Sequence, residues 1–316
     1  MKLGEIYDFV VRKGLEKDPR TKKEINQELQ RVRKEYRRLK NDKKYFDKEK
    51  LKHPFTDTRI LFGDKHRTVR TIMVGIDISG EELLTAYALN EKGACIDLAM
   101  SHHPSGKALA NLYGVMHIHK NILHHLGIDK NVADSIMNER IEEVSRKFMA
   151  INHERSVDIA RLLEIPFMCV HTPADNHVTY FLKRLFEKKK PRAVKGVMDI
   201  LKSIPEYQDA MRKGAGPKLI AGAEKNKAGR IMVDMTGGTE GSKKIFSRLS
   251  QAGVGTVVGM HFSEEHYRVA KAEFMNVVVA GHIASDNLGL NLILDKLTGK
   301  YDFNIIPCSG FVRIKR

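Results

Sequence analysis

The chain has 316 residues, 42% of them hydrophobic and 30% charged, and a formal net charge of +16. This length allows two domains with cores of their own, and the composition is typical of a globular protein rather than a disordered one. No stretch approaches the ~20 apolar residues of a membrane-spanning helix, and the charged N-terminus does not resemble a secretory signal, so we expect a cytoplasmic protein with no membrane partner.

The first segment of the chain is basic and predicted to be helical. Residues 1–54 carry 18 basic and 10 acidic side chains, and residues 24–52 contain no glycine or proline, which favours one long helix. Its apolar residues recur at alternating steps of four and three, and they are Ile25, Leu29, Val32, Tyr36 and Leu39. This seam predicts a helix that docks on the body of the protein or on another subunit. We assign residues 1–57 to an N-terminal helical extension, which is also a candidate surface for a protein partner.

Strands and helices alternate from Arg70 to the end of the chain. Apolar runs predict strands near 71–79, 95–104, 166–171, 217–222, 229–238, 253–261, 275–282 and 301–314. The stretches between them predict helices near 80–93, 108–126, 131–164, 241–253 and 263–274. This alternation is typical of α/β proteins with largely parallel, covered sheets. We therefore predict two α/β domains of similar size, residues 58–200 and residues 201–316.

Histidines and aspartates follow three of the predicted strands. They are His102 and His103 after one strand, His171 and Asp175 after another, and His282 and Asp286 after a third. Ligands collect beyond the carboxyl ends of strands in α/β sheets, and imidazole and carboxylate are ligands for zinc, manganese or iron. Pro104 restricts His103 to an extended conformation, in which neighbouring side chains point apart. His102 and His103 therefore suit two different metal ions, and we expect about two divalent ions per chain.

The motifs Ser-His-His-Pro, His-Thr-Pro-Ala-Asp and Gly-His-Ile-Ala-Ser-Asp occur in the order and rough spacing of those in the NIF-three-like family, which the chain resembles over roughly residues 70–310. Bacterial members are often labelled GTP cyclohydrolase type-two homologues. The resemblance implies two similar α/β domains with a dinuclear metal site in the cleft between them, often in ring-shaped homo-oligomers. It implies the metal ligands His102, His103, Asp175, His282 and Asp286. The last of these is usually a glutamate in the family, so this chain has a side chain one methylene shorter.

Three side chains are candidates for catalysis. Asp175 or Asp286 would accept a proton from a water molecule held between two metal ions. His266 stands near a histidine of the family that lies upstream of the last motif, and it either acts on the substrate or is an exposed helix residue. His171 either orients Asp175 or approaches the metal ions itself.

Three functions of different classes agree with these residues. The first is a metal-dependent hydrolase acting on a nucleotide or another phosphorylated, anionic small molecule, as the family label implies. The second is a non-catalytic metal-binding regulator or protein-interaction adaptor. The third is a nucleic-acid binder, supported by residues 1–54 and by residues 181–230, which carry 14 basic and 5 acidic side chains. No RRM, KH or zinc-finger pattern accompanies these basic segments, and we favour the hydrolase.

Overall fold

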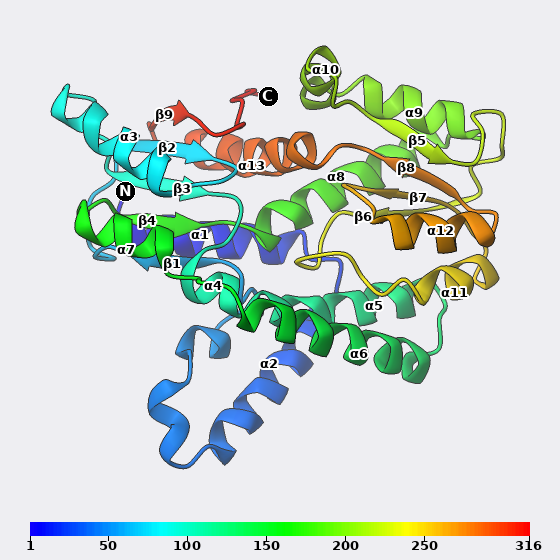
Figure 1. Cartoon of the computed structure of the whole chain (residues 1–316), viewed down its shortest axis with the longest axis horizontal. Coiled ribbons are helices and arrows are strands. Elements are labelled where there is room, and N and C mark those ends of the chain that lie inside the picture. The colour runs from blue at the N-terminus through cyan, green and yellow to red at the C-terminus, as the bar shows by residue number, and fades with distance from the viewer.

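The computed structural model describes residues 1–316 and contains two mixed sheets surrounded by helices (Figure 1). The elements of the first half are α1 (Leu3–Glu16), α2 (Lys22–Arg38), η1 (Asn41–Tyr45), η2 (Lys48–Leu51), β1 (Arg59–Phe62), β2 (Thr71–Gly75), α3 (Gly80–Glu91), β3 (Leu98–Ser101), α4 (Gly106–Ala110), η3 (Leu112–Met116), α5 (His117–His125), α6 (Lys130–Met149), α7 (Arg155–Leu162), β4 (Phe167–Cys169) and α8 (Thr172–Lys189). Those of the second half are α9 (Val194–Lys202), α10 (Pro205–Arg212), β5 (Lys218–Ala221), β6 (Arg230–Asp234), α11 (Ile245–Gln251), β7 (Val254–Gly259), α12 (Glu264–Ala272), β8 (Asn276–Val279), α13 (His282–Thr298) and β9 (Asn304–Pro307).

The two sheets follow one plan, which confirms the predicted α/β class. The first has the order β1-β4-β3-β2-β9 and the second the order β5-β8-β7-β6. In each sheet all neighbouring strands are parallel except for one antiparallel strand at an edge, β1 in the first and β5 in the second. Helices α1 and α13 pack on one face of the first sheet and α3 and α7 on the other. Both faces are therefore covered, which explains why the strands read as continuous apolar runs.

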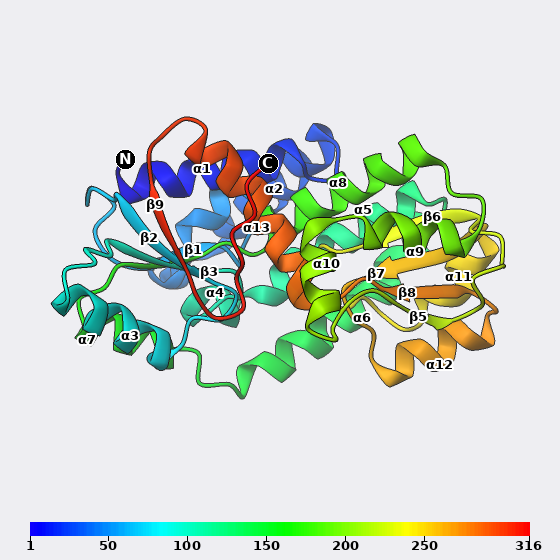
Figure 2. The same ribbon diagram turned by 90° about the horizontal axis from the view of Figure 1, so that it is seen from above.

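Helices α8 and α13 connect the two sheets and cross each other closely (Figures 1 and 2). Each follows a strand and has a histidine at its start, as the N-cap of α8 and as the first residue of α13, with an aspartate four residues later and an asparagine after that. Gly289 of α13 makes the crossing possible, because a Cβ there would lie 2.7 Å from the backbone carbonyl oxygen of Ala174 in α8. The crossing brings the first turns of the two helices together between the sheets.

The N-terminal extension differs from its prediction. Helix α1 belongs to the core of the first sheet, and α2 ends at Arg38 instead of running to residue 52. The chain then turns through η1 and η2, and the ring of Phe46 packs 4.9 Å from the ring of Tyr36. In the predicted seam, Ile25 and Leu29 are buried, whereas the three later residues are half-buried. The seam therefore docks on the body of the protein through its first half.

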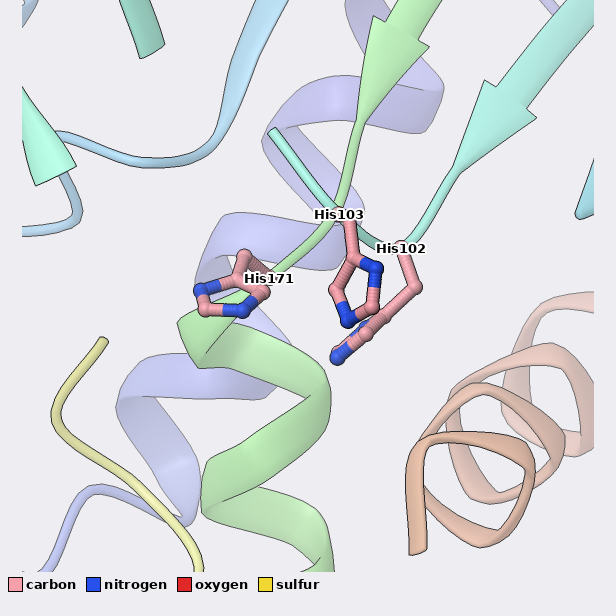
Figure 3. A group of neighbouring side chains, drawn as sticks. All are labelled: His102, His103 and His171. Atoms are coloured by element: carbon pink, nitrogen blue, oxygen red, sulfur yellow. The ribbon is translucent and has the colours of Figure 1, made fainter. Parts of the chain in front are cut away.

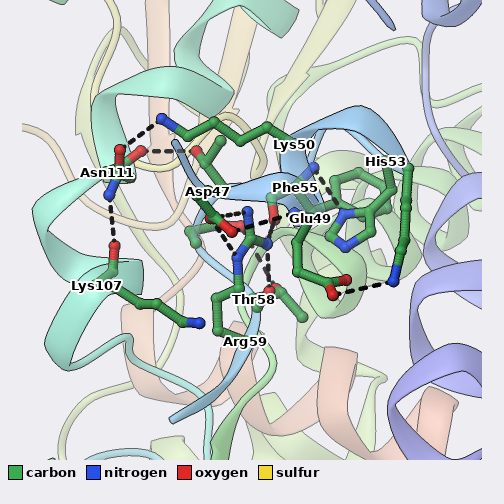
Figure 4. A network of polar contacts seen from close by, with 12 residues as sticks. Asp47, Glu49, Lys50, His53, Phe55, Thr58, Arg59, Lys107 and Asn111 are labelled. Carbon is green, nitrogen blue, oxygen red and sulfur yellow. Dashed lines mark hydrogen bonds and ion pairs between the residues drawn. The ribbon is translucent and has the colours of Figure 1, made fainter. Parts of the chain in front are cut away.

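A buried arginine ties the end of this extension to the first sheet (Figure 4). Arg59 at the start of β1 pairs with Asp47 at 2.9 Å and donates hydrogen bonds to the carbonyl oxygens of Phe55 and Thr58. These contacts hold residues 55–59 in one conformation. The segment matters because it contains Asp57, which reaches the functional site described below.

The predicted division of the chain at residues 57 and 200 stays a prediction. In the structure, some segments pack away from the rest of their predicted domain. β9 pairs with β2 and α13 packs on the first sheet, whereas α5 and α6 cover one face of the second sheet. None of the helices combines the length and the apolar character that crossing a bilayer would require.

Candidate metal centre

The three strand ends singled out in the sequence converge between the two sheets. His102 and His103 follow β3, His171 follows β4 and caps α8, and His282 opens α13 after β8. Figure 3 shows three of these imidazoles, those of His102, His103 and His171. The centroids of the His102 and His171 rings are 4.8 Å apart. The rings of His103 and His282 are 5.2 Å apart. Side chains from both halves of the chain therefore meet in one cluster.

The two aspartates lie close to the N-termini of α8 and α13, Asp175 in the first turn of α8 and Asp286 just after that of α13. Asp175 and Asp286 are both buried, and a helix N-terminus favours a negative charge at that position. The turn into α13 needs Gly281, which has a φ of 110° and leaves no room for a side chain because a Cβ would lie 3.0 Å from the carbonyl oxygen of Ala215. The local sequence thus places each carboxylate where the adjoining strand ends.

Distances within the cluster match those between ligands of one metal ion. His102 Nε2 lies 3.3 Å from Asp175 Oδ1 and 3.3 Å from Asp286 Oδ1. His103 Nε2 and His282 Nε2 lie 3.4 Å and 3.6 Å from the other oxygen, Asp286 Oδ2. Two ligand atoms that each lie ~2.1 Å from one tetrahedral ion are ~3.4 Å apart. The five residues therefore form groups that fit a metal ion, and Asp286 belongs to more than one group.

Several buried polar atoms in the cluster have no hydrogen-bond partner. They are His102 Nε2, Asp175 Oδ1 and both carboxylate oxygens of Asp286. Burying polar atoms without partners is costly, and the cost is greatest for charged carboxylates. Bound divalent cations would satisfy these four atoms, since each is a metal-ligand atom. The types of ligand atom and their lack of hydrogen-bond partners thus fit a metal centre.

The first two histidines are oriented by partners behind them. His102 Nδ1 donates to the carbonyl oxygen of Val170 at 3.0 Å, and His103 Nδ1 lies 2.7 Å from Asp77 Oδ1. With Nδ1 engaged in this way, Nε2 of each ring faces the cluster, as is usual for metal-binding histidines. The sequence prediction missed Asp77, although it follows β2 and the strand-end pattern extends to it.

His171 is held by a carboxylate from the N-terminal segment. Its Nδ1 lies 2.8 Å from Asp57 Oδ2, and the same oxygen accepts hydrogen bonds from the backbone N–H and the hydroxyl of Thr172. These bonds, His171 first, keep the pKa of the fully buried Asp57 below its usual value although burial opposes this. His171 Nδ1 is also 3.9 Å from Asp175 Oδ2, so His171 approaches both the cluster and Asp175. No pattern in the sequence pointed to Asp57.

The electrostatics of the cluster favour bound positive charge. Burial opposes protonation of His102, but the charges of Asp286 and Asp175 outweigh it and hold the pKa of His102 well above its ordinary value. Burial also disfavours the charged form of His103, but the nearby carboxylates of Asp286 and Asp77 raise its pKa to about 9. Burial alone would raise the pKa of Asp286, yet the surrounding imidazoles, His102 first, hold it far below the usual range. A metal ion supplies the same positive charge that protons supply without one.

His266 lies outside the cluster. Its Nε2 contacts the carbonyl oxygen of Gly241 at 3.0 Å and its Nδ1 lies 2.6 Å from Ser263 Oγ, so both ring nitrogens are engaged within the second half of the chain. Its catalytic role stays a prediction. The residue that faces the cluster from this side is His261, whose ring lies 4.7 Å from that of His282 and whose Nδ1 is 3.2 Å from Glu240.

Comparisons with known proteins show which solved structures have a similar fold. Neither a protein-family model nor a curated protein sequence matches the chain. The structure resembles that of a NIF3 superfamily protein from Sphaerobacter thermophilus, with a TM-score of 0.71 and 25% sequence identity over 81% of this chain and 92% of the other. Reduced HcgD from Methanocaldococcus jannaschii matches with a TM-score of 0.46 and 16% identity, over 78% of this chain and 87% of its own. A Bacillus cereus protein related to NIF3 matches with a TM-score of 0.40 and 11% identity, over 79% and 90%.

The two sheets, the likeness to the Sphaerobacter protein and the order of the three motifs agree with the resemblance noted in the sequence. The His and Asp cluster between the sheets is where that resemblance implies a metal site. Together these findings give the chain the fold of a NIF3 superfamily protein and support a NIF3-like family assignment.

Proposed function

We propose that the protein is a metal-dependent hydrolase with two divalent ions per chain, acting on a nucleotide or another phosphorylated small molecule. The observation that supports two ions is the position of Asp286. One of its oxygens faces His102, and the other faces His103 and His282. A carboxylate in this position would bridge two ions, one shared with Asp175 and the other with His282. The shorter aspartate therefore suffices where the family usually has glutamate.

The chemistry of the site suits hydrolysis. Two bound divalent ions supply Lewis acidity and lower the pKa of a water molecule near them. The protein then has to provide a group that accepts the proton of that water. Because Asp175 and Asp286 are proposed ligands, we assign this role first to His171, whose Nε2 carries no hydrogen bond and whose Nδ1 is held by Asp57. An imidazole backed by a carboxylate is a common general base.

Two cavities meet at His282. The one that also borders His171 and Asp175 measures about 50 Å³, which is room for one or two water molecules. The other measures about 390 Å³ and is lined on its apolar side by Ile283, Val312 and Ile314. We propose that the smaller cavity holds the reacting group and water, and that the larger one receives an apolar part of the substrate such as a nucleobase.

The test is metal-dependent turnover. Protein freed of metal by a chelator and reloaded with Zn²⁺, Mn²⁺ or Fe²⁺ is assayed against nucleoside triphosphates, phosphomonoesters and phosphodiesters. We expect turnover that requires metal. In Asp175→Asn it should fall more than ~100-fold, which is the upper end of the loss typical when an outer-shell partner of a metal site is changed. Asp158→Asn, which changes a partly exposed aspartate of α7, is the matched control and should keep full activity.

The second candidate is a non-catalytic metal-binding regulator. The small volume of the cavity beside the cluster favours it, because about 50 Å³ does not admit a substrate without movement. Tight binding of two ions per chain with no turnover of any substrate in the panel would support the regulator over the hydrolase.

A further inference from the structure

The second sheet ends in an open strand. β6 is the outermost strand in the order β5-β8-β7-β6 and pairs with β7 on one side only (Figure 2). Apart from the bonds of this ladder, the backbone of residues 230–234 makes no hydrogen bond. In a parallel edge strand, alternate residues direct their N–H and C=O groups away from the sheet. The outer side of β6 therefore offers unpaired donors and acceptors in a row.

A groove runs along this edge. It is a cavity of about 550 Å³, with residues 229–233 as its floor, α8 as one wall and α5 as the other. Ile122, Phe186 and Ile231 contribute apolar surface to it. Five strand residues at ~3.3 Å each span roughly 16 Å, so the groove matches an extended segment of four or five residues.

The α8 wall carries polar groups that have no partner in the chain. Thr179 is 6% exposed and lines the groove, and its buried hydroxyl makes no hydrogen bond. Lys183 follows one turn later on the same face, and Lys190 ends the helix; neither forms an ion pair. By contrast, Glu187 is paired with Arg184 on the same helix. The wall thus presents a free hydroxyl and two free ammonium groups to whatever lies in the groove.

We propose that this groove binds an extended, acidic segment of a partner protein, which adds to the second sheet as a strand beside β6. Main-chain hydrogen bonds to β6 would supply affinity, as in other cases of strand addition. Acidic side chains on one side of the segment would meet Lys183 and Lys190, and Thr179 would donate to a carbonyl or carboxylate oxygen. Apolar side chains on its other side would cover Ile122 and Ile231. The groove is separate from the metal cluster, since the two share no residue.

The probe is a fluorescein-labelled library of seven-residue peptides with Asp or Glu at odd positions and Val, Ile or Thr at even positions. We expect peptides from it to raise the anisotropy signal with full-length protein. Lys183→Glu/Lys190→Glu should weaken this binding by about tenfold or more, whereas the matched pair Lys188→Glu/Lys189→Glu, on the same helix but outside the groove, should change it less than about twofold. Backbone N-methylation of the peptide should abolish binding, and bound peptide should slow amide hydrogen exchange in residues 230–234.

Each other outcome overturns the proposal. Equal weakening by both lysine pairs would show non-specific attraction between charges. Binding that survives N-methylation would show a pocket for a small anion rather than for a strand. Protected β6 amides in a free protein that sediments as a dimer would show that a second copy of the chain fills the groove. If no peptide in the library bound, the proposal of an acidic, strand-forming partner would be wrong.

Discussion

Replacing Asp286 with asparagine should remove both proposed metal ions, because its two oxygens face separate groups of ligands. The substitution preserves the shape of the side chain but removes its charge and turns one oxygen into an N–H donor, which cannot bind a metal ion. Asp175 faces only the group that contains His102. We therefore expect Asp175→Asn to lose one ion and keep the other.

The size of the effect follows from the contacts of Asp286. Outer-shell partners of metal sites typically change affinity ~10–100-fold, so loss of a charged direct ligand should exceed ~100-fold, or about 2.8 kcal/mol, at each ion. Metal content after dialysis, measured by elemental analysis, should be near two ions per chain in the wild type, one in Asp175→Asn and none in Asp286→Asn. Competition with a coloured chelator gives the affinities, and a thermal melt checks folding. If Asp286→Asn kept one ion, or Asp175→Asn lost both, the bridging role of Asp286 would be wrong.

Three further predictions concern residues outside the ligand set. Asp57→Asn should lower the free energy of unfolding by ~2 kcal/mol and lower metal-dependent turnover ~10–100-fold, because it breaks the buried bond to His171; denaturation and turnover measure both, and an unchanged turnover would exclude His171 as the general base. Gly289→Ala should destabilise the protein by ~1–3 kcal/mol despite the better helix propensity of alanine, since its Cβ would meet the backbone of Ala174; a stabilised variant would contradict the close helix crossing. Burial, followed by the charge of a nearby arginine, lowers the pKa of His53 to about 3, so the unfolded chain takes up a proton below pH ~6.5 that the folded chain does not, and stability from this residue falls as the pH drops from 6.5 towards 3. At pH 5 the loss is ~2 kcal/mol, and urea denaturation at pH 7 and pH 5 should show a smaller difference for His53→Gln; an equal difference would exclude His53 as the cause.

Local patterns in the sequence correctly predicted many elements of the fold. Every predicted strand has a counterpart, because runs such as residues 71–75 and 276–279 are apolar at successive positions and lie in sheets covered on both faces. The paired motifs at His171 and His282 also marked the residues that gather at the centre. The helix predicted over residues 24–52 was too long, because a pattern of charges does not reveal that Phe46 folds back onto Tyr36.

Other features depended on contacts between distant parts of the chain. Asp57 and His171 are separated by 114 positions, and no local pattern links them, so only the folded chain shows that one holds the other. The same is true of β9, which returns from the C-terminus to pair with β2. The sequence by itself determined which residue types stand at the strand ends, since backbone propensity and apolar periodicity are local properties. The tertiary structure decided which atoms face each other there, because the crossing of α8 and α13 and the anchoring of residues 55–59 arise from packing that no short segment encodes.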